Sequence, residues 1–211
     1  SLILKTIPQF LKSYKNLLTL KLKNNEITEL SFVIGELNKL EELDLRNNKL
    51  SELSSLIGKL KNLTALHLED NSLPALPAEL GQLTKLTALG ITGNDIQSLP
   101  AEMKNLSGMK NLIWESTTDS KKDISASFEV LSQMTGLETL HLILSKAGHL
   151  PPEIGTLQNI KELVLECSSL QSLPDEFGDI ANLEKLELRS CNILTDVNAL
   201  TQLSKLSMLQ M

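Results

Sequence analysis

Residues 40–50 read LEELDLRNNKL, and this motif recurs along the chain at a constant spacing. The pattern Leu-x-x-Leu-x-Leu-x-x-Asn-x-Leu, with isoleucine replacing some leucines, begins at Leu17, Leu40, Leu63 and Leu86, a period of 23 residues. Self-similarity at a fixed period of this length indicates a repeat architecture in which each unit packs mainly on its neighbours. The period therefore decides the fold and leaves function to the residues between the leucines.

Each repeat is predicted to combine a strand with a short helical return segment. The Leu-x-Leu centre alternates apolar and polar residues, which predicts a strand whose leucines face the core. Residues 76–83 read LPAELGQL, and their apolar spacing predicts a short helical turn with Pro77 at its first position and Gly81 at its end. The asparagine after each strand is expected to hydrogen-bond the buried turn, because a carboxamide both donates and accepts. Return segments are thicker than the spacing between strands, so we expect a curved array with a parallel sheet on its inside.

The fifth repeat departs from the regular pattern. It starts at Met109 and the next repeat starts at Leu137, so it spans residues 109–136 and is 28 residues long. We place the additional residues in the polar run Ser116–Asp123 and expect a protruding loop there, either functional or a tolerated insertion. Further departures, at the asparagine position, predict local changes of geometry: Thr117, Ser145, Ser168 and Cys191. We interpret residues 1–211 as a single array of about eight full repeats with partial ends.

The full repeat LPxxIGxLxxLxxLxLxxNxL resembles the Ras-group type of leucine-rich repeat, which occurs in plant intracellular proteins, animal scaffolds and many bacterial proteins. The resemblance covers nearly the whole chain. It implies the α/β class and a right-handed solenoid, or horseshoe, with a concave parallel β-sheet and short helical or irregular convex segments. It also implies protein recognition on the concave face, within a family whose members bind many unrelated proteins.

Composition and motifs argue against several classes of function. The net charge of −6 argues against nucleic acid as the main partner, because phosphate recognition needs a basic surface. No segment is apolar over a length that spans a bilayer, so membrane insertion is not expected. The chain has none of the phosphate-loop, zinc-protease or serine-nucleophile motifs, and two cysteines are too few for a disulfide scaffold. We therefore predict no catalytic residue, no metal and no cofactor.

Solvent-facing positions on the central strands provide the candidate binding surface. Small residues on neighbouring strands would form a smooth floor, aliphatic residues would stand beside it, and glutamates would form its rim. An apolar centre within a polar rim is typical of a protein interface, although aliphatic residues on strands also reflect β-propensity alone. The predicted partner-binding residues are the small Ala65, Ala88 and Gly90, the aliphatic Ile113, Ile143 and Val164, the glutamates Glu69, Glu115 and Glu166, and His67 and His141.

The tryptophan, the two cysteines and the histidines His67 and His141 are not expected to have catalytic or metal-binding roles. Trp114 occupies a leucine position, so we expect it in the core. Cys191 replaces the asparagine, and Cys167 is expected as a free thiol rather than as its disulfide partner, because disulfide geometry is demanding. His67 and His141 lie on strands too far apart to share a metal ion.

These observations predict a non-enzymatic protein–protein interaction module that presents its concave face rigidly to a protein partner. One alternative stays open, because both ends of the chain stop within the pattern. We expect an excerpt, or the ordered part, of a longer protein, which allows a targeting region of a larger enzyme such as a kinase, cyclase or ubiquitin ligase. A second alternative, carbohydrate or lipid recognition, ranks last because the solvent-facing strand positions contain no aromatic residue.

Overall fold

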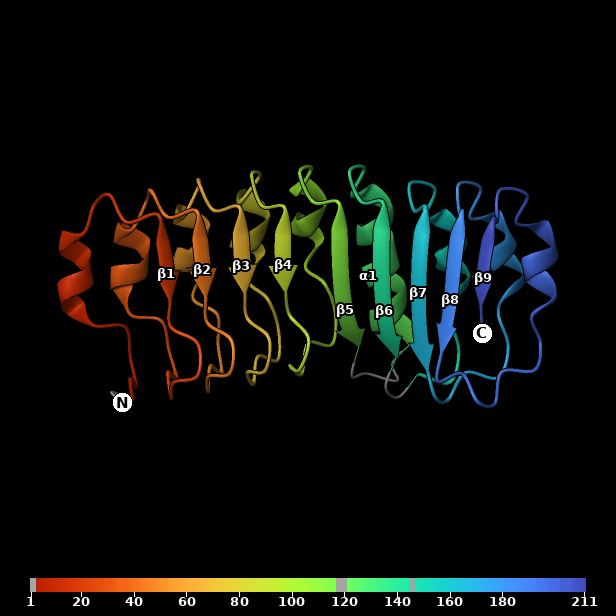
Figure 1. Ribbon diagram of the computed structural model, residues 1–211, viewed down its shortest axis with the longest axis horizontal. Coiled ribbons are helices and arrows are strands. Elements are labelled where there is room, and N and C mark those ends of the chain that lie inside the picture. Colours follow the sequence, from red (N-terminus) through yellow and green to blue (C-terminus); the bar gives the residue numbers. More distant parts are fainter. Residues whose placement is uncertain (1–2, 117–120, 145–146) are drawn as a thin grey trace.

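The structure is a computed structural model that describes residues 3–116, 121–144 and 147–211. Within these residues, nine parallel strands form one sheet in which each strand pairs with the next along the chain (Figure 1). The central leucines are in register, since Leu43 pairs with Leu66 and Leu66 with Leu89, and all three are buried. The predicted repeat solenoid with a parallel sheet is confirmed. The strands are β1 (Thr19–Lys21), β2 (Glu42–Asp44), β3 (Ala65–His67), β4 (Ala88–Gly90), β5 (Asn111–Ser116), β6 (Thr139–Leu144), β7 (Glu162–Cys167), β8 (Lys185–Arg189) and β9 (Met208–Gln210).

The return segments form a layer of short helices behind the sheet (Figure 1). Buried leucines and isoleucines fill the space between the two layers in one continuous core. The predicted helical turns are therefore confirmed, as five-residue 3-10 helices and one α-helix. They are η1 (Gln9–Ser13), η2 (Phe32–Glu36), η3 (Ser55–Lys59), η4 (Ala78–Gln82), η5 (Ala101–Asn105), α1 (Lys121–Gln133), η6 (Pro152–Thr156), η7 (Asp175–Asp179) and η8 (Asn198–Gln202).

In η4, proline and glycine act differently from the prediction. Pro77 is the N-cap of η4, and the helix begins at Ala78. Gly81 lies inside η4 without a positive φ, so it does not end the turn by a left-handed conformation. A Cβ at Gly81 would collide with the backbone carbonyl of Glu102 in η5. This glycine therefore allows neighbouring convex turns to approach closely.

Asparagine side chains hydrogen-bond the buried turns, as predicted, and also connect each regular repeat to the one before it. Asn48 Oδ1 accepts a hydrogen bond from the Ile27 amide at 3.0 Å. Its Nδ2 donates to the Leu22 and Leu45 carbonyls, each at 3.0 Å. Asn71 and Asn94 repeat this arrangement one and two turns later. The carboxamides thus satisfy backbone groups that the fold removes from water.

Strands β5 to β7 are longer than β1 to β4 because the chain does not turn inward at the usual point. In the regular repeats the residue before the asparagine has a positive φ, at Asn24, Asn47, Asp70 and Gly93. The equivalent residues, which stay in the strands, are Ser116, Leu144 and Cys167. Leucine and cysteine strongly disfavour a positive φ, so the strand continues where the turn is lost. Two of the predicted departures, Thr117 and Ser145, lie outside the described residues.

The irregular repeat lengthens its return segment into a true α-helix. The expected protruding loop is wrong at both ends of the polar run, because Ser116 ends β5 and α1 begins at Lys121. The residues between them, 117–120, lie outside the part of the chain that the structure describes. The hydroxyl of buried Ser127 on α1 accepts a hydrogen bond from the Leu99 amide at 3.0 Å.

Trp114 is fully buried, which confirms its predicted place in the core. Its ring meets the ring of Phe128 on α1 edge to face, with the centroids 6.5 Å apart. A larger helix and a larger strand residue thus fill the irregular repeat together.

The expectation of a free thiol at Cys167 is wrong, because Cys167 and Cys191 form a disulfide. Cys167 ends β7 and is fully buried, while Cys191 stands at the asparagine position of the following repeat. Both positions direct their side chains to the same interior, and the Cα atoms are 4.9 Å apart. Their separation of 24 residues, one repeat plus one residue, is the signal in the sequence that indicated this proximity.

Candidate functional site

The sheet brings the predicted binding residues together on its concave face. The apolar strand residues Leu66, Leu89 and Leu140 are buried, whereas the intervening positions are at least partly exposed. Strand pairing aligns these positions into rows that cross the sheet. One row contains His67, Gly90, Ile113, His141 and Val164, and the next contains Glu115, Ile143 and Glu166. We call the outward positions of β3 to β7, together with Glu69, the central concave surface.

The centre of this surface carries the aliphatic side chains. Ile113 on β5 is 45% exposed, which is high for a large apolar residue on a sheet. Ile143 and Val164, on β6 and β7, are partly exposed beside it. Within the described residues, no Phe, Tyr or Trp side chain lies on this surface, because Trp114 is buried and the phenylalanines and the tyrosine belong to helical segments or their caps.

Glu69 does not stand on a rim, contrary to the sequence analysis. Its carboxylate lies over Gly90 of the neighbouring strand, where a Cβ would overlap it. Oε1 of Glu69 is 3.5 Å from Nδ1 of His67, while Oε2 is buried and has no hydrogen-bond partner. The predicted floor of small residues is therefore covered in part by a carboxylate. Glu115, in contrast, accepts a hydrogen bond from the Gly93 amide at 2.8 Å through its Oε2.

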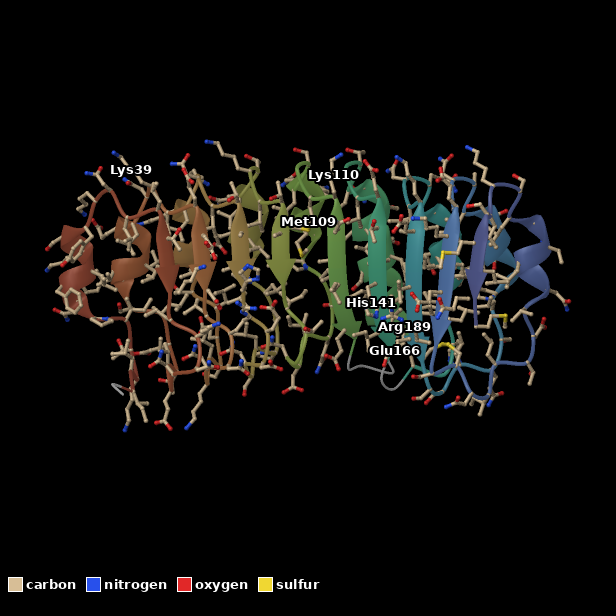
Figure 2. All side chains as sticks on the ribbon, viewed as in Figure 1. Lys39, Met109, Lys110, His141, Glu166 and Arg189 are labelled. Atoms are coloured by element: carbon tan, nitrogen blue, oxygen red, sulfur yellow. A yellow bond between two sulfur atoms is a disulfide. The ribbon has the colours of Figure 1, made fainter. Side chains whose placement is uncertain are left out.

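His141 lies in a polar group at the other end of the central concave surface. Figure 2 labels His141, Glu166 and Arg189, which come from β6, β7 and β8. Nε2 of His141 is 3.8 Å from Oε2 of Glu166, and Arg189 donates to Glu187 from both Nε and Nη2, at 2.7 and 2.9 Å. Burial, with a smaller contribution from the Arg189 charge, lowers the pKa of His141 below its ordinary value. Burial thus disfavours the charged form of His141.

Two pockets open on the concave face. The first, of about 220 Å³, lies over β4 and is lined by His67, Glu69, Ala88, Gly90, Asn111 and Ile113 among others. The second, of about 230 Å³, lies between β7 and β9 and includes Val164, Lys185, Glu187 and Met208. The first pocket contains five of the predicted binding residues, so sequence reasoning located its walls without predicting its shape.

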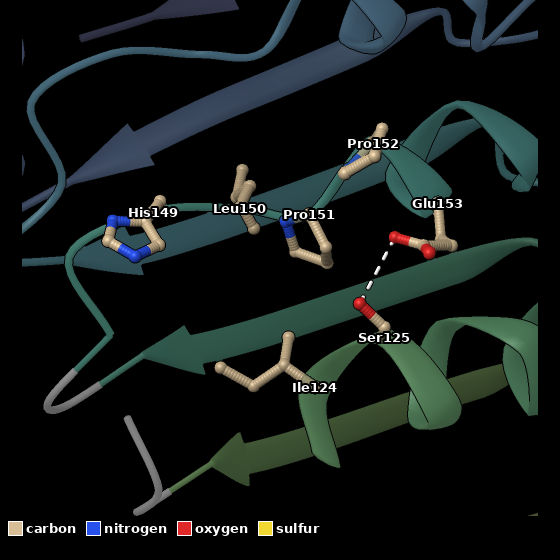
Figure 3. A pocket seen from close by; sticks show the side chains of 7 residues that line it. All are labelled: Ile124, Ser125, His149, Leu150, Pro151, Pro152 and Glu153. Carbon is tan, nitrogen blue, oxygen red and sulfur yellow. Dashed lines mark hydrogen bonds between the residues drawn. The ribbon is translucent and has the colours of Figure 1, made fainter. Parts of the chain in front are cut away.

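A third pocket, of about 180 Å³, lies away from the predicted surface (Figure 3). It is bounded by Ile124 and Ser125 on α1 and by the segment from His149 to Glu153 that leads into η6. Ser125 Oγ donates to Glu153 Oε2 at 3.1 Å across it. The sequence analysis did not predict this pocket. The signal in the sequence was the pair Pro151 and Pro152, which follows the irregular repeat and lines the pocket.

The described ranges contain no group of three or more His, Cys, Asp or Glu side chains placed to hold a metal ion. In the same ranges, no helix has the length and apolar character needed to cross a membrane.

Comparison with known proteins agrees with the geometry. A family model described as leucine-rich repeat region matches residues 5–148. The chain belongs to the leucine-rich repeat family. A comparison of this leucine-rich repeat protein with curated proteins finds no match.

Solved structures similar to this leucine-rich repeat protein include a bacterial protein, a domain of a type III effector and a plant receptor. A leucine-rich repeat protein of Leptospira interrogans is 29% identical with a TM-score of 0.67, over 99% of this chain and 59% of its own. The leucine-rich repeat domain of the type III effector XopL is 26% identical with a TM-score of 0.83, over 99% of this chain and 73% of its own. The plant peptide hormone receptor RGFR1, in complex with RGF2, is 26% identical with a TM-score of 0.66, over 100% of this chain and 34% of its own. The chain thus spans little more than half the length of the Leptospira protein.

Proposed function

We propose that this leucine-rich repeat protein is a non-enzymatic module that binds a protein partner through its central concave surface. The observation that carries the proposal is the exposed aliphatic centre formed by Ile113 and its neighbours Ile143 and Val164, with charged residues around it. Large apolar side chains in contact with water favour burial against a partner, and a polar surround is typical of protein interfaces.

The rigidity of the sheet supports the same proposal. Asparagine side chains and continuous strand pairing hold the neighbouring rows in fixed register. A surface that is already ordered loses little conformational entropy on binding. The family is commonly used for protein interaction, and the similarity to a receptor in complex with RGF2 is consistent with such a role.

The experiment is a pull-down from an extract of the source organism, with retained proteins identified by mass spectrometry. We compare the parent chain with the double variant Ile113→Asp/Ile143→Asp. The matched control is Phe32→Asp, which places the same charge at a residue of the convex helix η2 that is 56% exposed. Thermal unfolding of all three proteins establishes that they are folded.

We expect the parent and Phe32→Asp to retain the same protein and the double variant to lose it. Buried carboxylates at an apolar contact are costly unless they are paired, so the loss should exceed tenfold, corresponding to roughly 1.4 kcal/mol. Retention of the same proteins by the folded double variant would contradict the assignment of the concave face.

A further inference from the structure

The pocket over β4 is built around a carboxylate with one oxygen, Oε2 of Glu69, that has no hydrogen-bond partner among the described residues. Glu69 bends over Gly90, the one position of the row where the absence of a side chain leaves space for it. Only 24% of the Glu69 side chain is exposed. Its Oε2 is buried and accepts no hydrogen bond. A buried carboxylate oxygen without a donor loses hydration without compensation. The arrangement therefore favours a turn of the carboxylate that brings this oxygen to a donor on a ligand in the pocket.

The arginine beside the pocket, Arg46, is already paired with another carboxylate, while His67 faces Oε1 of Glu69. The Asn47 amide donates to the Glu69 carbonyl at 3.0 Å, which places Arg46 beside Glu69 along the row. Arg46 instead donates to Asp44 from Nε at 3.0 Å and from Nη2 at 2.7 Å. Asp44 is almost completely buried, and these hydrogen bonds lower the pKa of its carboxyl group. The pairing keeps Arg46 engaged with Asp44 and leaves Oε2 of Glu69 without a donor.

The walls of the pocket suit a planar cation on an apolar stem. Ala88 and the exposed Ile113 offer apolar surface, and Asn111 adds a carboxamide to the lining of the same pocket. A guanidinium group has five donors in one plane and can bind both oxygens of a carboxylate, as Arg46 and Arg189 already do on this face. A lysine ammonium has the same charge and lacks this forked geometry.

We propose that this pocket receives an arginine side chain of the protein partner, with Glu69 as the residue that binds its guanidinium. The inference rests on the proposed function, since the arginine reaches the pocket from a chain seated on the concave face. Gly90 is the positioning residue, because any side chain there displaces the Glu69 carboxylate.

The test is a titration of the isotope-labelled protein with acetyl-Leu-Arg-Leu-amide, followed by the backbone amide signals of Gly90 and Thr92 in NMR spectra. The same tripeptide with citrulline removes the charge and keeps the shape, and the tripeptide with lysine keeps only the charge. The variants are Glu69→Gln and, as the matched control, Glu129→Gln, an exposed glutamate on the convex helix α1.

We expect saturable shifts at Gly90 with the arginine peptide, an affinity weaker by about tenfold or more with citrulline, and an intermediate affinity with lysine. Glu69→Gln should reduce the arginine affinity by the same factor, while Glu129→Gln should leave it unchanged. Absence of saturable shifts, equal binding of citrulline and arginine, or equal losses in both variants would overturn the proposal.

The pull-down separates failure of this inference from failure of the proposed function. A partner that is lost by Ile113→Asp/Ile143→Asp and fully retained by Glu69→Gln uses the concave face without the arginine pocket, which refutes only the inference. Arginine binding that depends on Glu69, combined with a partner that the double variant still retains, supports the pocket and refutes the wider assignment of the face.

Discussion

Asn48→Ala tests the hydrogen-bonding role of the buried asparagines directly. The carboxamide joins three buried backbone groups: the Ile27 amide, which donates to Oδ1, and the Leu22 and Leu45 carbonyls, which accept from Nδ2. Alanine removes these hydrogen bonds and a fourth, to the Arg46 carbonyl at 3.3 Å. The Leu22 and Leu45 carbonyls keep other donors, the side chains of Asn25 and Asn71, so the Ile27 amide is the group left without a partner. A buried amide without a partner costs about 1–3 kcal/mol and each other lost hydrogen bond about 0.5–1.5 kcal/mol, so the low values together give a loss of about 2.5 kcal/mol in the free energy of unfolding.

The matched control is Asn25→Ala in the preceding repeat. Asn25 makes the same kind of contacts, with the Leu4 amide and the Leu22 and Lys23 carbonyls, in partly exposed surroundings. Water can replace a hydrogen bond there, so we expect a loss of only about 1 kcal/mol.

Guanidinium chloride unfolding followed by circular dichroism measures both changes. If the slope of the unfolding free energy against denaturant concentration is the same in the parent and both variants, the three free energies of unfolding can be compared directly. If Asn48→Ala destabilised the protein no more than Asn25→Ala does, the reasoning from buried backbone groups would be refuted.

Three further outcomes follow from contacts in the structure. Ser127→Ala should lower the free energy of unfolding by about 1–2 kcal/mol in denaturant titrations, because the Leu99 amide loses its buried acceptor; an unchanged midpoint would contradict this. Gly81→Ala should cost about 1–3 kcal/mol in the same assay, since its Cβ would collide with the Glu102 carbonyl, and a stabilised variant would show that the close approach is not needed. Burial lowers the pKa of His141 from its ordinary value of 6.5, so the unfolded chain binds the proton more tightly than the folded chain does. The contribution of neutral His141 to stability is therefore complete above pH 6.5 and is lost as the pH falls through the folded-state pKa. His141→Gln should therefore lose less stability than the parent between about pH 7.5 and 5, and parallel pH profiles would refute the assignment.

The repeat period was sufficient to predict the arrangement of the strands. A leucine at a fixed position of each repeat needs burial, and only stacking with register preserved buries all of them at once. The same reasoning correctly placed Trp114 in the core and the asparagine side chains at the turns. The outward positions of the central strands also follow from alternation alone, so their common face was predictable.

The length of the central strands and the form of the irregular repeat were not predicted, although the residues carried part of the signal. A positive φ before the asparagine suits Asn24 or Gly93 and disfavours Leu144, which was readable from residue type. Whether the residues of the irregular repeat form a loop or the helix α1 depends on what Phe128 and Ser127 contact across the core. Those contacts exist only after neighbouring repeats have stacked.

The sequence by itself determined the period, the faces of the strands and the chemical character of the concave side, because these depend on the spacing of residue types along one chain. Tertiary structure decided the pairing of Cys167 with Cys191 and the position of the Glu69 carboxylate over Gly90. Each of these joins side chains from two neighbouring repeats, and its geometry depends on how closely the repeats stack and how each side chain is oriented. A period specifies which residues become neighbours, whereas their packing specifies which atoms meet.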